Sequence, residues 1–148
     1  MKAESLSNIN QVFLANKVSV YKPLTLYANH PAAGFPTPGD DEVERLLDIN
    51  DYLLENPEAT FFIRVQGDSM ERAGIFSGDI LVVDRSKEVS EGDIVVAAVY
   101  GELVVKRLKR IGNTHHLISE QVGYEPIVVP EKDDCMIWGT VIGSVRKF

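Results

Sequence analysis

The sequence predicts a mainly β protein with a barrel-like or sandwich fold, one or two short helices and a flexible N-terminal arm. Three observations lead to this prediction. Short apolar runs rich in β-branched residues follow one another from residue 60 to the C-terminus. Glycine-containing turn signals separate most of these runs, and prolines concentrate upstream, in residues 31–41. Short strands at such regular spacing are typical of an all-β sandwich or barrel.

Residues 31–41 mark the boundary between the arm and a globular domain. They contain three prolines, two glycines and two aspartates. Because proline fixes its own φ and donates no hydrogen bond to a strand, this stretch is extended or looped. Upstream, residues 18–27 are rich in β-branched and aromatic side chains. We therefore divide the chain into an arm over residues 1–39 and a β domain over residues 40–148.

The segment Asp41–Asn56 fits two structures. Its leucines have partial helical spacing, whereas Leu47–Ile49 fits a short strand equally well. Asn50 or Asp51 is a suitable N-cap, and Pro57 ends any helix that precedes it. We predict a short helix at about residues 51–56.

Seven strands are predicted beyond Thr60. They lie at residues 61–65, 80–83, 94–100, 103–108, 116–119, 127–129 and 138–145. The turns at Ser77–Asp79 and Glu91–Asp93 each lead into an isoleucine, but the similarity ends after a few residues. They are therefore two similar strand entries and not a structural repeat.

Length and composition restrict the function. A chain of 148 residues fits one domain with a real hydrophobic core. Its net charge of −7 argues against direct DNA binding, which requires clustered basic residues, and the densest basic run, Lys106–Arg110, is short. The single cysteine, Cys135, excludes an intramolecular disulfide and fits a reducing cytoplasm.

The sequence predicts a cytoplasmic protein without a membrane segment, metal or cofactor. The N-terminus lacks the apolar core of a signal peptide, and no run approaches about 18 apolar residues. The carboxylates lack metal-ligand spacing, and no glycine-rich phosphate loop is present. His30 lies in the arm, while His115 and His116 would point to opposite faces of a strand, so we assign no catalytic role to the histidines.

Ser69 is a candidate nucleophile. It follows Gly67 and Asp68 at the exit from an apolar strand and precedes Met70–Ala73, which fits one helical turn. Backbone N–H groups at the start of such a turn can hold the oxyanion of a tetrahedral intermediate. The alternative is that Asp68 or Ser69 merely caps the turn, and this segment alone favours that alternative.

Lys106 is a candidate general base, 37 positions after Ser69. With strand alternation it shares a face with Val104 and Leu108, and this apolar setting would lower the pKa of its amine. A neutral lysine amine can accept the proton of a serine hydroxyl. The alternative is a lysine whose ammonium reaches water along the protein surface.

Ala33–Gly34 is a candidate cleavage site in the arm. Small side chains let an extended segment enter a narrow site, and tethering raises the effective concentration of the bond. The alternative is a plain linker.

Taken together, these motifs resemble the LexA-like self-cleaving serine peptidases, and within them the UmuD type. The resemblance spans residues 33–145. It rests on Ala-Gly-Phe-Pro-Thr-Pro (33–38), Asn-Pro-Glu-Ala-Thr-Phe-Phe (56–62), Gly-Asp-Ser-Met (67–70), Gly-Asp-Ile-Leu-Val-Val-Asp (78–84), Gly-Asp-Ile-Val (92–95) and Val-Val-Lys-Arg-Leu (104–108). Some UmuD-type proteins have cysteine before the scissile glycine, and Ala33 is similar to the repressor-type site instead.

The resemblance implies a site and a biological role. It implies that Ser69 is the nucleophile, Lys106 the general base and Ala33–Gly34 the scissile bond, with the Asp68 and Ser69 amides as oxyanion donors. It also implies a LexA-type peptidase domain and a cytoplasmic homodimer of the SOS response to DNA damage. A RecA–single-stranded DNA filament would stimulate self-cleavage. The product would be the accessory subunit of an error-prone Y-family polymerase, UmuC-like, in translesion synthesis.

Other functions stay open at this point. A repressor of the LexA or phage type needs a helix-turn-helix reader, and only 33 residues precede the cut, which favours the UmuD type. A binding module with the same fold but no required cleavage is the second alternative. A processing peptidase acting on other proteins is the third, and the lack of a membrane anchor disfavours it.

Overall fold

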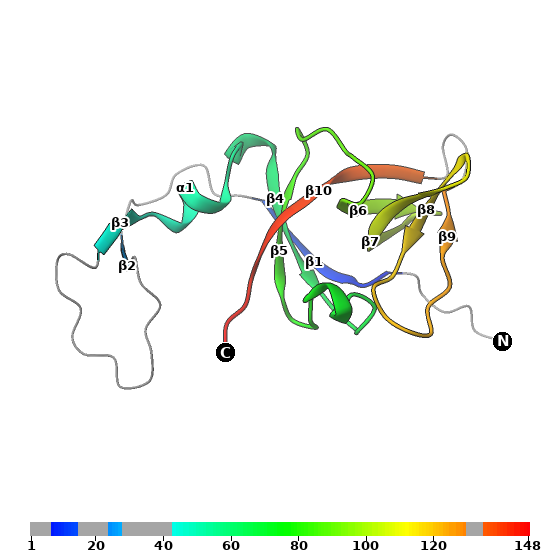
Figure 1. The fold of residues 1–148 in the computed structure, drawn as a ribbon, viewed down its shortest axis with the longest axis horizontal. Coiled ribbons are helices and arrows are strands. Elements are labelled where there is room, and N and C mark those ends of the chain that lie inside the picture. Colours follow the sequence, from blue (N-terminus) through cyan, green and yellow to red (C-terminus); the bar gives the residue numbers. More distant parts are fainter. Residues whose placement is uncertain (1–6, 15–23, 28–42, 130–134) are drawn as a thin grey trace.

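The computed structural model describes residues 7–14, 24–27, 43–129 and 135–148, which form a mainly antiparallel β structure (Figure 1). Eight strands form one sheet in the order β1-β4-β5-β10-β6-β7-β8-β9, and β2 and β3 pair separately. The predicted fold class is confirmed. The strands are β1 (Ile9–Leu14), β2 (Leu24–Tyr27), β3 (Val43–Leu47), β4 (Thr60–Val65), β5 (Ile80–Asp84), β6 (Ile94–Val99), β7 (Glu102–Ile111), β8 (Thr114–Ile118), β9 (Ile127–Val128) and β10 (Cys135–Val145).

The helices of the described residues are short. Helix α1 spans Ile49–Leu53, and 3-10 turns η2 and η3 span Pro57–Ala59 and Glu71–Ala73. The helix predicted at residues 51–56 begins and ends earlier in the structure, because its N-cap is Asp48 and not Asn50 or Asp51. The Asp48 carboxylate accepts hydrogen bonds from the amides of Asn50 at 2.8 Å and Asp51 at 3.3 Å, which satisfies donors at the helix start.

Strand β10 connects the two halves of the sheet and crosses Figure 1 as one long strand. Its residues 135–140 pair with β6, and its residues 140–145 pair with β5. Register shifts next to Gly139 and Gly143 bend the strand, as bulges do. A Cβ at Gly139 would lie 2.8 Å from Val83 Cγ1, so glycine permits the close approach of β10 to β5.

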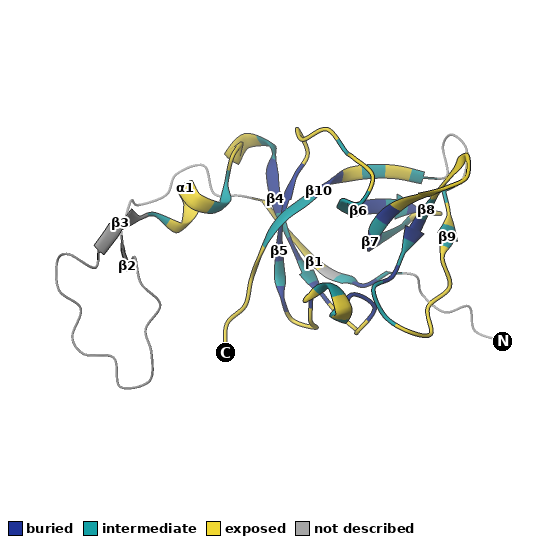
Figure 2. Cartoon of the chain, viewed as in Figure 1, coloured by how far each residue is buried: buried dark blue, intermediate teal, exposed yellow. Residues whose placement is uncertain are grey.

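The sheet encloses two hydrophobic clusters, and β6 and β7 contribute to both. Figure 2 shows buried residues on both of these strands. One cluster contains Phe61, Ile63, Val65, Met70, Ile75, Leu81, Val83, Val96 and Val105. The other contains Val95, Ala97, Val99, Val104, Leu108 and Leu117. Because successive side chains of a strand point to opposite faces, Lys106 lies on the same face as Val104 and Leu108, as predicted.

The N-terminal segment contains a strand that the sequence analysis did not predict. Strand β1 pairs antiparallel with β4, from Ile9 opposite Val65 to Leu14 opposite Phe61. Part of the predicted arm is therefore an edge strand of the large sheet. The division of the chain at residue 39 stays a prediction, and residues 28–42 lie outside the described residues.

Candidate active site

Ser69 lies in a turn that the core holds in place. The turn follows β4 and passes through Gly67, whose φ of 82° is in the left-handed region that glycine adopts without strain. Met70, which directly follows Ser69, is 1% exposed and packs into the first hydrophobic cluster. The predicted helical turn after Ser69 is the 3-10 turn η3. As a result, the Ser69 side chain is fixed at the protein interior, with only 5% of the residue exposed.

The amides of Asp68 and Ser69 remain candidates for oxyanion donors. The Asp68 carbonyl accepts a hydrogen bond from Glu71 N at 3.1 Å, which closes the turn. Among the hydrogen bonds of residues 7–14, 24–27, 43–129 and 135–148, none has the Asp68 or Ser69 amide as its donor. These two N–H groups are thus available to a ligand, as an oxyanion hole requires.

Lys106 is buried on strand β7. It is 5% exposed, between the fully buried Val105 and the half-buried Arg107, which contradicts the alternative of a lysine extended into water. Burial lowers the pKa of its amine from the usual value to about 8, because the charged form loses hydration. Its Nζ lies 5.4 Å from the ring centre of Tyr124, within cation–π range. Within the described residues it forms no ion pair.

Ser69 and Lys106 line one cavity with a volume near 610 Å³. The cavity also receives side chains from the N-terminal segment and from the loop between β8 and β9. Its lining residues are Ser7, Asn8, Gln66, Gly67, Asp68, Ser69, Lys106, Ser119, Gly123, Tyr124, Glu125 and Ile127. The structure thus brings the predicted nucleophile and base together, while the predicted cleavage site, Ala33–Gly34, lies outside the described residues.

Asn8 and Tyr124 contact Ser69, its turn or Lys106, and neither was predicted from the sequence as a site residue. Asn8 donates a hydrogen bond from Nδ2 to Ser69 Oγ at 3.1 Å. The Tyr124 hydroxyl donates to the Asp68 carboxylate, so this tyrosine contacts both the Ser69 turn and Lys106. Asn8 stands in a polar segment without a motif, and Tyr124 stands in an irregular loop. Nothing in the sequence indicates that Asn8 contacts Ser69, 61 residues away, or that Tyr124 contacts Asp68, 56 residues away.

Two kinds of site are not found in the described part of the chain. It contains no group of three or more histidine, cysteine, aspartate or glutamate side chains that could hold a metal ion. None of its helices is long and apolar enough to cross a membrane.

Comparison with known proteins gives three informative relatives. ImpA of Escherichia coli is 51% identical over 83 residues, 56% of this chain and 57% of ImpA. SamA of Salmonella typhimurium is 41% identical over 125 residues, 82% of this chain and 84% of SamA. MucA of Escherichia coli is 34% identical over 134 residues, 90% of this chain and 92% of MucA. The match to ImpA therefore spans little more than half of that protein, whereas the other two matches are nearly complete.

The comparisons also identify the family. Residues 25–142 match the family described as Peptidase S24-like, and this range includes both Ser69 and Lys106. The resemblance to LexA-like peptidases of the UmuD type, which rested on short motifs, is confirmed. The chain belongs to the Peptidase S24-like family.

Proposed function

We propose that this protein is a UmuD-like SOS mutagenesis protein that cleaves its own Ala33–Gly34 bond with a Ser69–Lys106 dyad. One observation carries the proposal. A serine and a lysine that are far apart in the sequence are both 5% exposed and line one cavity, and the pKa of the lysine amine is lowered to about 8. Members of the Peptidase S24 family are self-cleaving serine peptidases, which supports this reading of the pair.

The first step forms an acyl-enzyme. Neutral Lys106 accepts the hydroxyl proton of Ser69, and Ser69 Oγ attacks the carbonyl carbon of Ala33. The negative charge that develops on the carbonyl oxygen is stabilised by the amides of Asp68 and Ser69. The Lys106 ammonium then returns the proton to the nitrogen of Gly34 as the Ala33–Gly34 bond breaks. The segment from Gly34 onward leaves with a free amine.

The second step hydrolyses the ester between Ser69 and Ala33. A water molecule gives a proton to Lys106 and attacks the ester carbonyl, which releases residues 1–33 with a free carboxylate and restores the Ser69 hydroxyl. Because the substrate is part of the chain, its effective concentration is high, and each molecule needs only one turnover. A modest base at pKa about 8 is therefore sufficient.

The relatives support the biological role. ImpA, SamA and MucA are UmuD-like SOS mutagenesis proteins. By this relationship, the protein is a cytoplasmic homodimer whose cleavage is stimulated by a RecA–single-stranded DNA filament. The shortened form then acts as the accessory subunit of a Y-family polymerase. The filament would act by favouring the conformer in which residues 33 and 34 lie at Ser69, which is a population shift and not a new reaction.

Mass spectrometry tests the cleavage. The purified protein is incubated at about pH 10, where Lys106 is mostly neutral. We expect two products that correspond to residues 1–33 and 34–148, at higher yield near neutral pH when the RecA filament is added. Ser69→Ala is the matched control and should stay intact. Identical products from the wild type and Ser69→Ala, or a cut at another bond, would contradict the proposal.

A further inference from the structure

The cavity at Ser69 already holds a side chain of this chain. Asn8 is 6% exposed, and its carboxamide makes three hydrogen bonds there. Nδ2 donates to Ser69 Oγ and to the Val105 carbonyl, both at 3.1 Å, and Oδ1 accepts from Val105 N at 2.6 Å. A buried polar group is stable when its donors and acceptors are satisfied in this way. Asn8 is therefore bound specifically at the candidate nucleophile.

The backbone of Val105 explains why a carboxamide fits. Strand β7 pairs with β8 only from Arg107 onward, where Arg107 lies opposite Ile118. Val105 lies before that point, and the carboxamide of Asn8 supplies both a donor and an acceptor to its backbone. A peptide group of an extended segment offers the same pair of groups. Asn8 thus occupies a position that suits a backbone segment beside Ser69.

Strand β1 holds Asn8 in place. The Asn8 carbonyl accepts a hydrogen bond from Gln66 N at 2.8 Å, next to the Ser69 turn. The following residues pair with β4 through the backbone, from Ile9 opposite Val65 to Leu14 opposite Phe61. Residues 7–14 consequently bind as a unit, with the strand as the anchor and Asn8 as the group that enters the cavity.

We propose that residues 7–14 compete with the cleavage segment for the Ser69 site, so that self-cleavage requires Asn8 to leave. This inference rests on the proposed function. The reacting carbonyl must lie beside Ser69 Oγ, where Nδ2 of Asn8 now lies. The two segments cannot occupy this place together. The fraction of molecules without Asn8 in the cavity therefore limits the observed rate.

The first test weakens the competitor in the full-length protein. Asn8→Ala removes all three side-chain hydrogen bonds, and we expect self-cleavage at about pH 9 to become on the order of tenfold faster. Gln11→Ala is the matched control on the same strand, because it removes only an exposed contact. It should change the rate less than about twofold. A rate that is unchanged or lower in Asn8→Ala overturns the inference, and so does an equal acceleration in Gln11→Ala.

A second test locks the competitor in place. Gln11 and Arg64 are opposite each other in the β1–β4 pair, and such Cα atoms lie about 4.5–5.5 Å apart, which a disulfide can span. Gln11→Cys/Arg64→Cys is prepared with Cys135→Ser, so that no other thiol is present. We expect the oxidised form to cleave itself at least about tenfold more slowly than the reduced form of the same protein. Equal rates would overturn the inference.

A third measurement does not depend on cleavage. Hydrogen exchange of the Val105 amide is followed at about pH 6, where Lys106 is protonated and the chain stays intact. Asn8→Ala should accelerate this exchange, and Gln11→Ala should not. Unchanged exchange in Asn8→Ala would show that Asn8 does not hold the cavity in solution, which overturns the inference. If no variant releases the fragment under any condition, the proposed function is wrong and the competition is wrong with it, whatever Val105 shows.

Discussion

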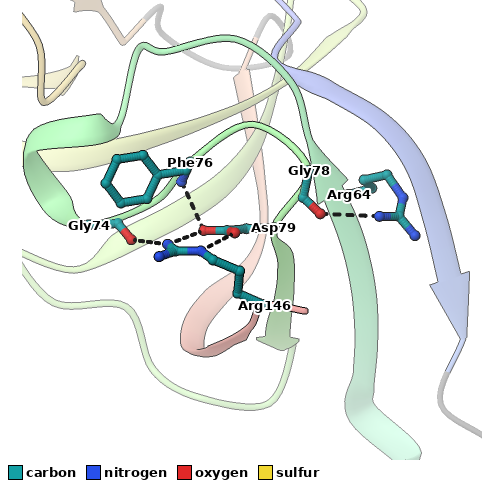
Figure 3. A network of polar contacts seen from close by, with 6 residues as sticks. All are labelled: Arg64, Gly74, Phe76, Gly78, Asp79 and Arg146. Carbon is teal, nitrogen blue, oxygen red and sulfur yellow. Dashed lines mark hydrogen bonds and ion pairs between the residues drawn. The ribbon is translucent and has the colours of Figure 1, made fainter. Parts of the chain in front are cut away.

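Asp79 and Lys106 are charged side chains buried in two regions of this molecule, and their surroundings are opposite. Asp79, at the turn before β5, is 1% exposed and lies in a network of ionic and hydrogen bonds (Figure 3). Its carboxylate accepts two hydrogen bonds of 2.7 Å from Arg146 and one of 2.8 Å from Phe76 N. The hydrogen bond with Arg146 lowers the pKa of Asp79, so the carboxylate stays charged. The Arg146 guanidinium also stacks on Phe76.

Lys106 is buried to a similar degree, and in the part of the chain that the structure describes it has no ion-pair partner. Its neighbour in space is the neutral ring of Tyr124, and burial lowers the pKa of its amine to about 8. A paired buried charge stabilises one arrangement of the chain, whereas an unpaired one costs stability and shifts its proton affinity toward neutral pH. The comparison therefore separates a structural pocket at Asp79 from the proposed reactive one at Lys106.

Lys106→Met gives the largest expected effect. Methionine keeps an unbranched side chain of similar size but cannot accept a proton, so self-cleavage should fall at least about 100-fold. The free energy of unfolding at pH 7 should rise, by up to about 3 kcal/mol, because the folded pKa of about 8 lies below the unfolded value. Fragment release and urea unfolding of the same samples measure both effects.

The control for this stability gain is the pH dependence of the difference in unfolding free energy between Lys106→Met and the wild type. Below pH 8 the lysine is protonated in both states and its burial costs the full amount, whereas above the unfolded pKa it is neutral in both and the cost disappears. The difference between Lys106→Met and the wild type should therefore shrink as the pH rises from 8 to about 10.5. A difference that is the same at pH 7 and at high pH would contradict an unpaired buried lysine.

Asp79→Ala should lower the stability and leave self-cleavage nearly unchanged, which is the opposite of Lys106→Met. It leaves Arg146 without its carboxylate partner and the Phe76 amide without its acceptor, so the free energy of unfolding should fall by about 2–4 kcal/mol. Self-cleavage per folded molecule should change little at a temperature where the variant is folded, because Asp79 does not line the Ser69 cavity. Thermal unfolding by circular dichroism and fragment release check the two parts. A loss of cleavage without a loss of stability would show that the two pockets are not separate.

The sequence predicted the mainly β fold and the local settings of Ser69 and Lys106 because these depend on local patterns. Strand alternation around Lys106 correctly gave its apolar face, and the turn at Gly67–Met70 correctly gave the setting of Ser69. The N-cap of α1 was assigned two or three residues too late, because Asp48, Asn50 and Asp51 are all good capping residues and only the final geometry selects one.

The missed parts depend on contacts between distant segments. Strand β1 is a polar–apolar mixture whose pairing with β4 joins residues about 50 positions apart, and no local periodicity shows such a pairing. Asn8 and Tyr124 reach the cavity through the same kind of contact. A site residue that enters from an edge strand or a loop therefore requires the structure, whereas a residue in a strand or a turn can be predicted.

The pH dependence of the cleavage rate also distinguishes a buried Lys106 from an exposed lysine. The base must be neutral, so below its pKa the rate should rise about tenfold per pH unit and should level off above about pH 8. An exposed lysine would give a rate that still rises to about pH 10.4. The acidic groups that line the cavity are Asp68 and Glu125, and burial rather than charge sets the pKa of Lys106. Initial rates of fragment release from pH 6 to 10 measure the profile, and a rise that continues beyond pH 10 would contradict the burial argument.

Tyr124→Phe should have the smallest effect and tests what the neutral neighbour contributes. Phenylalanine keeps a ring over Lys106 Nζ but loses the hydroxyl that donates to the Asp68 carboxylate beside Ser69. Because one hydrogen bond at a partly exposed position is weak, cleavage should slow only about threefold. The midpoint of the pH profile should not move, since the ring still covers the amine and phenylalanine adds no charge. A displaced midpoint at an unchanged maximal rate would show that the tyrosine acts on the proton affinity of Lys106 and not on the position of the Ser69 turn.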